Sequence, residues 1–145
     1  MKAVVQRVKS ATLAVDGKLI SSIDCGLVVF LGIKKGDTGE QVLKMATKIA
    51  NLRVFEDAGG KMNLNVKDVK GEILLVSQFT LYGDCSHGNR PSFTMAEEPV
   101  RAEVLYEECV RNVRFLDVPV KTGVFGADMK IEQYNDGPVT IIIEI

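Results

Sequence analysis

Short apolar segments with alternating polar positions dominate the first third of the chain. Four of them are rich in β-branched residues and bounded by turn residues, as strands are: residues 2–8, 11–16, 18–23 and 26–33. Asp16-Gly17 is typical of a two-residue hairpin turn, and Cys25-Gly26 marks a second break. This pattern predicts an antiparallel meander.

Two later segments have apolar residues at helical spacing. Thr38, followed by Gln41 three residues on, fits a capping box at the start of a helix that extends to about residue 51. Its apolar positions are Val42, Met45, Ala46, Ile49 and Ala50. A second helix begins near Glu97-Glu98-Pro99, because acidic residues and proline are favoured at helix N-termini. Its apolar positions are Ala102, Leu105, Cys109, Val113 and Leu116.

The remaining apolar segments predict further strands, at residues 52–56, 72–79, 118–122, 128–134 and 138–144. Residues 72–76 are apolar on consecutive positions, as in a strand buried on both faces. Asn135-Asp136-Gly137 separates the last two strands, and we interpret it as a hairpin turn. Pro138 follows that glycine directly, although proline lacks the backbone donor that a strand ladder uses.

Together these segments predict one α+β domain spanning residues 1–145. Antiparallel β-sheets form a barrel-like or sandwich core with two main flanking helices. The composition, 46% hydrophobic and 26% charged, is that of an ordinary globular domain. The longest apolar runs, such as residues 27–33, are too short to cross a bilayer, and no export signal is present. We therefore expect a cytoplasmic protein that does not contact membranes.

Charge is distributed unevenly between the two halves of the chain. Residues 1–70 hold twelve Lys/Arg and seven Asp/Glu, whereas residues 71–145 hold six and twelve, for a formal net charge of −1. The first half could supply a basic face for a polyanionic partner, although solvated surface charge explains the same pattern. The overall balance argues against a protein that grips long nucleic acid through many phosphates.

Several kinds of chemistry are excluded by what the sequence lacks. His87 is the single histidine, in a polar loop, and no GxSxG segment supplies a serine nucleophile. Three cysteines without a CxxC spacing indicate neither a zinc site nor a disulfide framework. Neither GxxxxGK[ST] nor GxGxxG occurs to hold phosphates. We expect no metal and no cofactor.

One polar cluster stands at the end of a buried strand. Residues 74–76 lead directly into Ser77, Gln78 and Thr80, and polar groups at such a place need hydrogen-bond partners. Each of them alone could satisfy neighbouring backbone. As a group they could instead line the floor of a pocket in which backbone N–H groups stabilise an oxyanion.

Residues 77–81 (SQFTL) and 135–140 (NDGPVT) resemble the two signature motifs of the D-aminoacyl-tRNA deacylases, also called D-tyrosyl-tRNA deacylases. Four more segments match this family in the same order: residues 6–8 (QRV), 60–63 (GKMN), 90–93 (RPSF) and 122–129 (TGVFGADM). The resemblance covers essentially the whole chain. One departure is the loop at residues 85–89, which is less basic than is usual in the family.

The resemblance implies a cytoplasmic homodimer without a cofactor, with active sites at the subunit interface. Such enzymes hydrolyse the ester that joins a D-amino acid to the 3′-terminal adenosine of tRNA, and they reject L-aminoacyl-tRNA. Members also remove glycine from mischarged tRNA, so we expect activity on glycyl-tRNA mischarged on tRNA-Ala. In the family the glycine-proline peptide is cis and enters the partner's pocket.

Carried over residue by residue, the resemblance implies two groups of site residues. The catalytic group is Ser77, Gln78, Phe79 and Thr80, which line the pocket. The substrate-binding group is Gly137 and Pro138 at the corner, Phe125 and Met129 around the adenosine, and Arg7, which braces the corner.

Glycine followed by proline suits chiral rejection, because enantiomers differ only in geometry and main-chain atoms have no rotamers through which to yield. Gly137 also lacks a Cβ, so the chain can approach the substrate closely. For the chemical step, the Thr80 hydroxyl, the backbone amides near Phe79 and the 2′-hydroxyl of the tRNA remain open. No base is available to activate Thr80, which favours the last two.

Three other functions are compatible with parts of the sequence. A non-catalytic, oligomeric ligand-binding module would use the glycine-proline pair only as a turn. A general RNA-binding module would use the basic first half and show steep salt dependence without a chirality effect. A thiol hydrolase would depend on Cys85 and His87.

Overall fold

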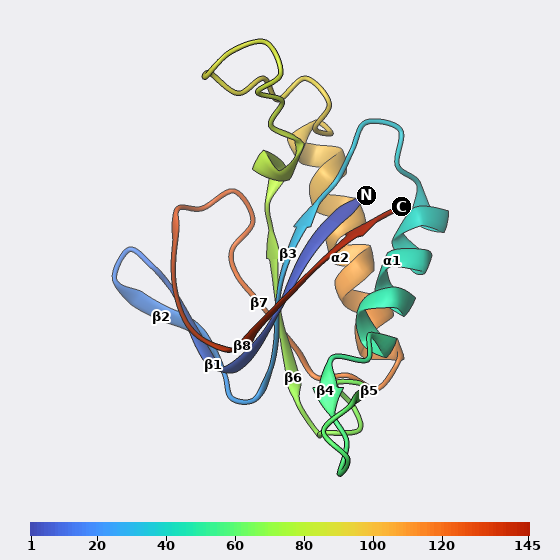
Figure 1. Ribbon diagram of the computed structural model, residues 1–145. Helices are drawn as coiled ribbons and strands as arrows, with labels where there is room; N and C mark the ends of the chain where they lie inside the picture. The colour runs from blue at the N-terminus through green and yellow to red at the C-terminus, as the bar shows by residue number, and fades with distance from the viewer.

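The structure is a computed structural model that describes residues 1–145, and a mixed six-stranded sheet forms its centre (Figure 1). β1 (Lys2–Val15) pairs with three other strands of that sheet and bends along its length. Its first half pairs antiparallel with β3 (Gly26–Gly32) and its second half with β2 (Lys18–Ile23). Along its other edge, β1 pairs with β8 (Met129–Glu144). The predicted strands 2–8 and 11–16 are therefore one continuous strand.

The other half of the sheet is parallel. β6 (Glu72–Ser77) pairs parallel with β3, and β7 (Val120–Thr122) pairs parallel with β6. Parallel neighbours need long crossover connections, and α1 (Gly39–Asn51) and α2 (Pro99–Phe115) lie in those two connections. The α+β fold class with two main helices is confirmed, and the parallel pairs are an addition to the antiparallel sheets expected.

The sheet curves until β2 approaches β7, which makes it barrel-like. The Ser21 hydroxyl donates to the Thr122 carbonyl at 2.6 Å, and Lys121 Nζ donates to the Ser22 carbonyl at 2.6 Å. No ladder joins these two strands, so side chains complete the closure. A separate two-stranded hairpin, β4 (Phe55–Glu56) and β5 (Met62–Leu64), follows α1, and the second of these strands was not predicted.

Both helices cover one face of the sheet and lie side by side (Figure 1). The capping box of α1 is present: Thr38 accepts from the Glu40 N–H, and Gln41 accepts from the Thr38 N–H at 2.9 Å. All five apolar positions predicted for this helix are buried. Neither helix has the length and hydropathy that crossing a membrane requires.

The strand predicted to be buried on both faces is β6, and the structure confirms it. Ile73 and Leu75 belong to the large cluster between sheet and helices. Leu74 and Val76 belong to a second cluster on the opposite face of the sheet. Because β6 is fixed from both sides, its C-terminal end is a rigid place from which to present side chains.

The predicted hairpin at residues 135–137 is wrong. β8 continues from Met129 to Glu144, and both of its halves pair with β1. Asn135 pairs with Val8 and Thr140 pairs with Gln6, so five steps along β8 match two along β1. The surplus residues bulge out of the strand at Gly137-Pro138. Local turn residues signalled a reversal, but β1 is long enough to pair with the chain on both sides of the bulge.

Candidate active site

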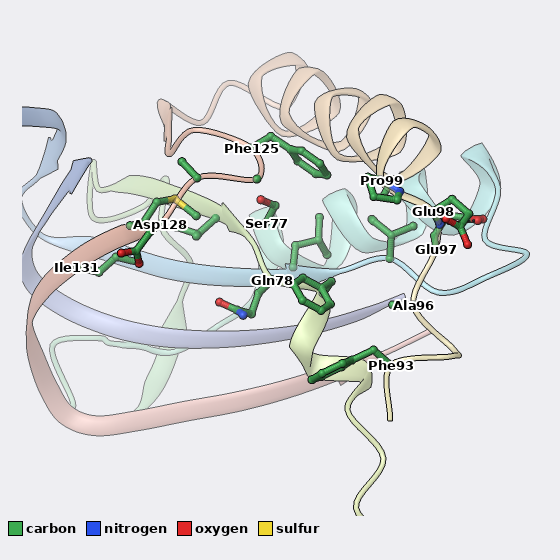
Figure 2. A pocket seen from close by; sticks show the side chains of 18 residues that line it. Ser77, Gln78, Phe93, Ala96, Glu97, Glu98, Pro99, Phe125, Asp128 and Ile131 are labelled. Atoms are coloured by element: carbon green, nitrogen blue, oxygen red, sulfur yellow. Dashed lines mark hydrogen bonds between the residues drawn. The ribbon is translucent and has the colours of Figure 1, made fainter. Parts of the chain in front are cut away.

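A cleft of about 550 Å³ opens where β6 ends, beside the first turn of α2 and the loop that precedes β8 (Figure 2). We call this cavity the cleft. Ser77, Gln78 and Phe125 lie in its middle, Asp128 and Ile131 at one end, and Glu97 with Pro99 at the other. Its size suits a small organic ligand or the end of a larger one.

The cleft brings together five residues predicted for the site from two distant parts of the sequence. They are Ser77, Gln78, Phe79, Phe125 and Met129. Thr80 is next to the cleft, exposed, and its hydroxyl accepts a hydrogen bond from the Gln78 side-chain amide. The hydroxyl is therefore already engaged by its neighbour rather than by a base.

The chain turns sharply at the end of β6, which exposes these side chains. The Gln78 N–H donates to the Leu31 carbonyl of β3 at 2.8 Å, and the short helix η1 (Phe79–Tyr82) follows. Phe79 is 57% exposed, and its ring meets the ring of Phe93 edge to face at 5.1 Å. The sequence analysis did not name Phe93 as a site residue, although it belongs to the matched segment at residues 90–93.

Phe125 is held from behind by a buried tyrosine. Its ring lies 5.9 Å from that of Tyr106, whose hydroxyl donates to the Leu75 carbonyl in β6 at 2.8 Å. Burial, with a smaller contribution from Cys109, raises the pKa of the Tyr106 hydroxyl, so this donor keeps its proton. α2 thereby ties the aromatic wall of the cleft to the sheet.

Met129 lies against a glycine that admits no side chain. A Cβ on Gly123 would overlap the Met129 sulfur and press on Leu13 at 3.0 Å. The loop between β7 and β8 can therefore fold closely over the sheet only with glycine at this position. This contact sets the position of Met129 at the wall of the cleft.

Gly137 and Pro138, which we call the corner, are exposed and do not line the cleft. Their peptide bond is cis, and the φ angle of Gly137 is +122°. Arg7, 6% exposed, lies beneath the corner. Its Nε donates to the Asp136 carbonyl at 3.2 Å and its Nη1 donates to the Val54 carbonyl at 2.6 Å. The Asp136 carboxylate lies 3.3 Å from Nε, which gives the same arginine an ion pair.

The corner is distant from the cleft of its own chain. Arg7 is level with Leu27 and Ile73 in the sheet, whereas Ser77 stands four residues further along β6 (77 − 73 = 4). Three strand spacings separate β8 from β6. At about 3.3 Å per residue and about 4.8 Å per strand, the two sites are roughly 20 Å apart. The structure therefore does not bring Gly137, Pro138 and Arg7 together with the other predicted residues.

The cleft contains acidic side chains and no basic ones. Glu97, Glu98 and Asp128 line it, and no Lys, Arg or His does. His87 and Cys85 are exposed in the loop after η1 and lie outside it. No group of three or more His, Cys, Asp or Glu side chains is arranged to hold a metal ion.

Comparison with known proteins gives consistent matches over the whole chain. The profile of the family described as D-Tyr-tRNA(Tyr) deacylase matches residues 4–144. A D-aminoacyl-tRNA deacylase of Geotalea uraniireducens (strain Rf4) is 54% identical over 144 residues, which cover 99% of this chain and 93% of the relative. A D-aminoacyl-tRNA deacylase of Aquifex aeolicus (strain VF5) is 55% identical, covering 99% of this chain and 97% of the relative.

Solved structures agree with the sequence comparisons. The c-Myc DNA Unwinding Element Binding Protein superposes with a TM-score of 0.93 at 45% identity, covering 100% of this chain and 99% of the other. A probable eukaryotic D-amino acid tRNA deacylase superposes with a TM-score of 0.85 at 17% identity, covering 99% and 98%. At that identity, the second match supports the fold alone.

Proposed function

Since the chain belongs to the D-Tyr-tRNA(Tyr) deacylase family and hydrolyses the ester bond of D-aminoacyl-tRNA, we propose that its active site is the cleft, completed by the corner of a second subunit. The catalytic group is Ser77, Gln78, Phe79 and Thr80. Phe125 and Met129 hold the terminal adenosine, and Arg7 fixes the corner that Gly137 and Pro138 present.

The position of the corner carries this proposal. It is exposed, held by a buried arginine, and roughly 20 Å from the cleft of its own chain. A braced, exposed element this far from the cleft of its own chain is suited to complete the cleft of a second copy. β8 also has one edge without a strand partner, and its Tyr134 and Ile142 are 65% and 68% exposed. An unpaired edge with apolar residues favours association with a second copy.

Chiral selection in this arrangement comes from exclusion. The corner places main-chain atoms where the side chain of an L-aminoacyl group would lie, while a D side chain projects away from it. A steric penalty of about 4 kcal/mol would give roughly thousandfold discrimination. Glycine carries no side chain to exclude, so we extend the proposal to glycyl-tRNA mischarged on tRNA-Ala.

We propose that water attacks the ester carbonyl and that the oxyanion is held by main-chain N–H groups at Phe79 and Thr80. The first N–H groups of a helix have no partner within it, and these two residues begin η1. Collapse of the tetrahedral species breaks the bond to the 3′-oxygen, which leaves as the ribose hydroxyl after taking the proton from the water. The adjacent 2′-hydroxyl is placed to relay that proton, because no basic side chain lines the cleft.

We propose that the protein acts in the cytoplasm, where aminoacyl-tRNA is used. A matched pair of D-tyrosyl-tRNA and L-tyrosyl-tRNA tests the substrate claim. Catalytic amounts of enzyme should release D-tyrosine over many turnovers and leave the L-ester intact. A non-catalytic binding module would leave both esters intact even at stoichiometric protein.

Subunit complementation tests the shared site. One variant carries a blocked cleft, Ser77→Phe, and the other an altered corner, Pro138→Ala. The Ser77→Phe homodimer should be inactive, whereas the Pro138→Ala homodimer should release L-tyrosine as well as D-tyrosine, because its open cleft faces an altered corner. After the two are mixed in equal amounts and reassembled at random, half of the open clefts should face an intact corner, so hydrolysis of L-tyrosyl-tRNA per open cleft should fall by about half. Unchanged hydrolysis of L-tyrosyl-tRNA after mixing, with mixed dimers present, would refute a site built from two subunits.

A further inference from the structure

A carboxylate at one end of the cleft has no role in the proposed chemistry. The Glu97 side chain is 8% exposed and lines the cleft, next to Ala96 and Pro99 and away from Ser77 (Figure 2). A nearly buried carboxylate needs hydrogen-bond donors to offset its loss of hydration. The question is which donors it has and which it lacks.

The protein supplies Glu97 with only part of its capacity. Arg101 Nε lies 3.5 Å from Oε2, one helical turn further on, and the Glu98 N–H donates to Oε1 at 3.0 Å. A carboxylate can accept about four hydrogen bonds, so roughly two positions remain. The backbone of the same residue is fixed, since the Glu97 N–H donates to the Ile33 carbonyl at 3.0 Å. The side chain is therefore held in place with acceptor capacity to spare.

The surface between Glu97 and the middle of the cleft is apolar. Ile33, Ala96, Ala102 and the rings of Phe79 and Phe93 line it. Small aliphatic side chains opposite aromatic rings suit a flat heteroaromatic group better than a flexible chain. Because Phe125 and Met129 hold the adenosine in the proposed active site, the base of that nucleoside is the flat group within reach.

We propose that Glu97 is a specificity-determining residue whose carboxylate accepts a hydrogen bond from the exocyclic amine of the terminal adenine. This inference rests on the proposed function of the cleft. A carboxylate accepts from the amine of adenine and repels the carbonyl oxygen that guanine or uracil carries in the corresponding position. Arg101 pairs with Glu97 at 3.5 Å and balances its charge, so this carboxylate can serve a neutral amine donor.

The matched probes are two non-hydrolysable 3′-amide analogues of D-tyrosyl ester, one built on adenosine and one on purine riboside, which lacks the exocyclic amine. Wild type should bind the adenosine compound about tenfold more tightly, the typical worth of one hydrogen bond to a charged group. Glu97→Ala should bind both compounds equally, at the level of wild type with purine riboside. Glu97→Gln keeps an acceptor oxygen and should retain most of the preference.

Glu107 provides the control. It pairs with Arg111 at the same spacing on α2, at 3.8 Å, but 61% of its side chain is exposed. Glu107→Ala should keep the full preference for adenosine, which separates loss of the acceptor from loss of a helix ion pair.

Two results would overturn the proposal. In the first, Glu97→Ala weakens the binding of both compounds to the same degree. In the second, the loss of binding in Glu97→Ala depends on the α-amine of the tyrosyl group and not on the amine of the base. Deacylation of D-tyrosyl-tRNA by wild type is measured in parallel. Normal turnover without dependence on the exocyclic amine refutes only the role of Glu97, whereas absent turnover refutes the proposed function.

Discussion

The cleft takes its walls from side chains of several separate segments, whereas the corner presents main chain held by one buried arginine. Phe79 and Phe93 are exposed rings with freedom to adjust, at 57% and 37% exposed, while Phe125 is supported by Tyr106. Gly137 and Pro138 have no such freedom above Arg7. The difference matches two tasks, since a common adenosine can be held by adaptable rings but enantiomers can be separated only by a surface that does not move.

Removal of Arg7 should have the largest effect. Arg7→Ala leaves the buried Val54 carbonyl without its donor and the Asp136 carboxylate with only Lys9, at 3.9 Å. Because the Asp136 side chain is 38% exposed, the expected cost is about 3 kcal/mol, the low end for a buried pair. Urea denaturation should show that loss, and discrimination between D- and L-tyrosyl-tRNA should fall with it. Arg7→Lys keeps the positive charge but not the planar set of guanidinium N–H donors, so a stability between those of wild type and Arg7→Ala is expected. Unchanged stability in Arg7→Ala would contradict the bracing role.

A methyl group at the corner should mainly affect selection. Gly137→Ala puts a Cβ 2.9 Å from Val139 and 3.3 Å from Arg7 Nη2 at a φ of +122°, which shifts the corner and costs about 1–3 kcal/mol. The ratio of kcat/KM for D- over L-tyrosyl-tRNA should fall at least about tenfold, because 1.4 kcal/mol is a factor of ten.

Gly17 is the matched control for that substitution. It also has a positive φ, +73°, and a Cβ there would meet no atom within 4 Å. Gly17→Ala should lower stability slightly and leave the ratio unchanged. Equal ratios in both variants would show that the corner does not select.

The support behind Phe125 should contribute less. Tyr106→Phe removes the bond to the Leu75 carbonyl and should cost about 1–2 kcal/mol at neutral pH, measured by thermal unfolding. Burial raises the folded-state pKa of Tyr106 above its ordinary value of 10.0. Its contribution is therefore fully present below pH 10 and declines above it, where the unfolded tyrosine ionises first. The difference between wild type and Tyr106→Phe should shrink above pH 10, and a difference that grew there would reverse the sign of this argument.

The smallest effect is expected at Thr80. Its hydroxyl contacts the Gln78 amide, and no base lies beside it, so Thr80→Ala should lose less than about tenfold in kcat, as for one orienting hydrogen bond. Thr80→Val keeps the shape and should behave alike. A loss of several thousandfold with binding intact would assign the hydroxyl a direct part in the chemical step.

The sequence predicted helices and strands correctly where their formation depends on residues close by in the chain. The capping box at Thr38, the buried face of α1 and the two-sided burial of β6 are examples. The hairpin at residues 135–137 failed, because a turn signal does not reveal that β1 continues as a partner on both sides.

The same contrast between local signals and long-range contacts holds for the candidate site. Ser77 to Thr80 could be placed at the end of a core strand from sequence alone, and the motif resemblance supplied Phe125 and Met129. Phe93 and Glu97 were missed, because their place in the cleft depends on contacts between residues far apart in the chain. Hydrophobic periodicity carries no information on such contacts.

The bulge in β8 also limits which insertions and deletions the sequence can accept. Side chains in a strand face alternate sides. From Ser10↔Tyr134 to Gln6↔Thr140, six steps along β8 match four along β1, and this even surplus of two keeps Ile141 and Ile143 in phase with the first half of the strand. Deleting or inserting one residue there would turn the apolar C-terminal residues outward or reshape the bulge. Substitutions between residues 135 and 140 should therefore be tolerated far more easily than changes in the length of this segment.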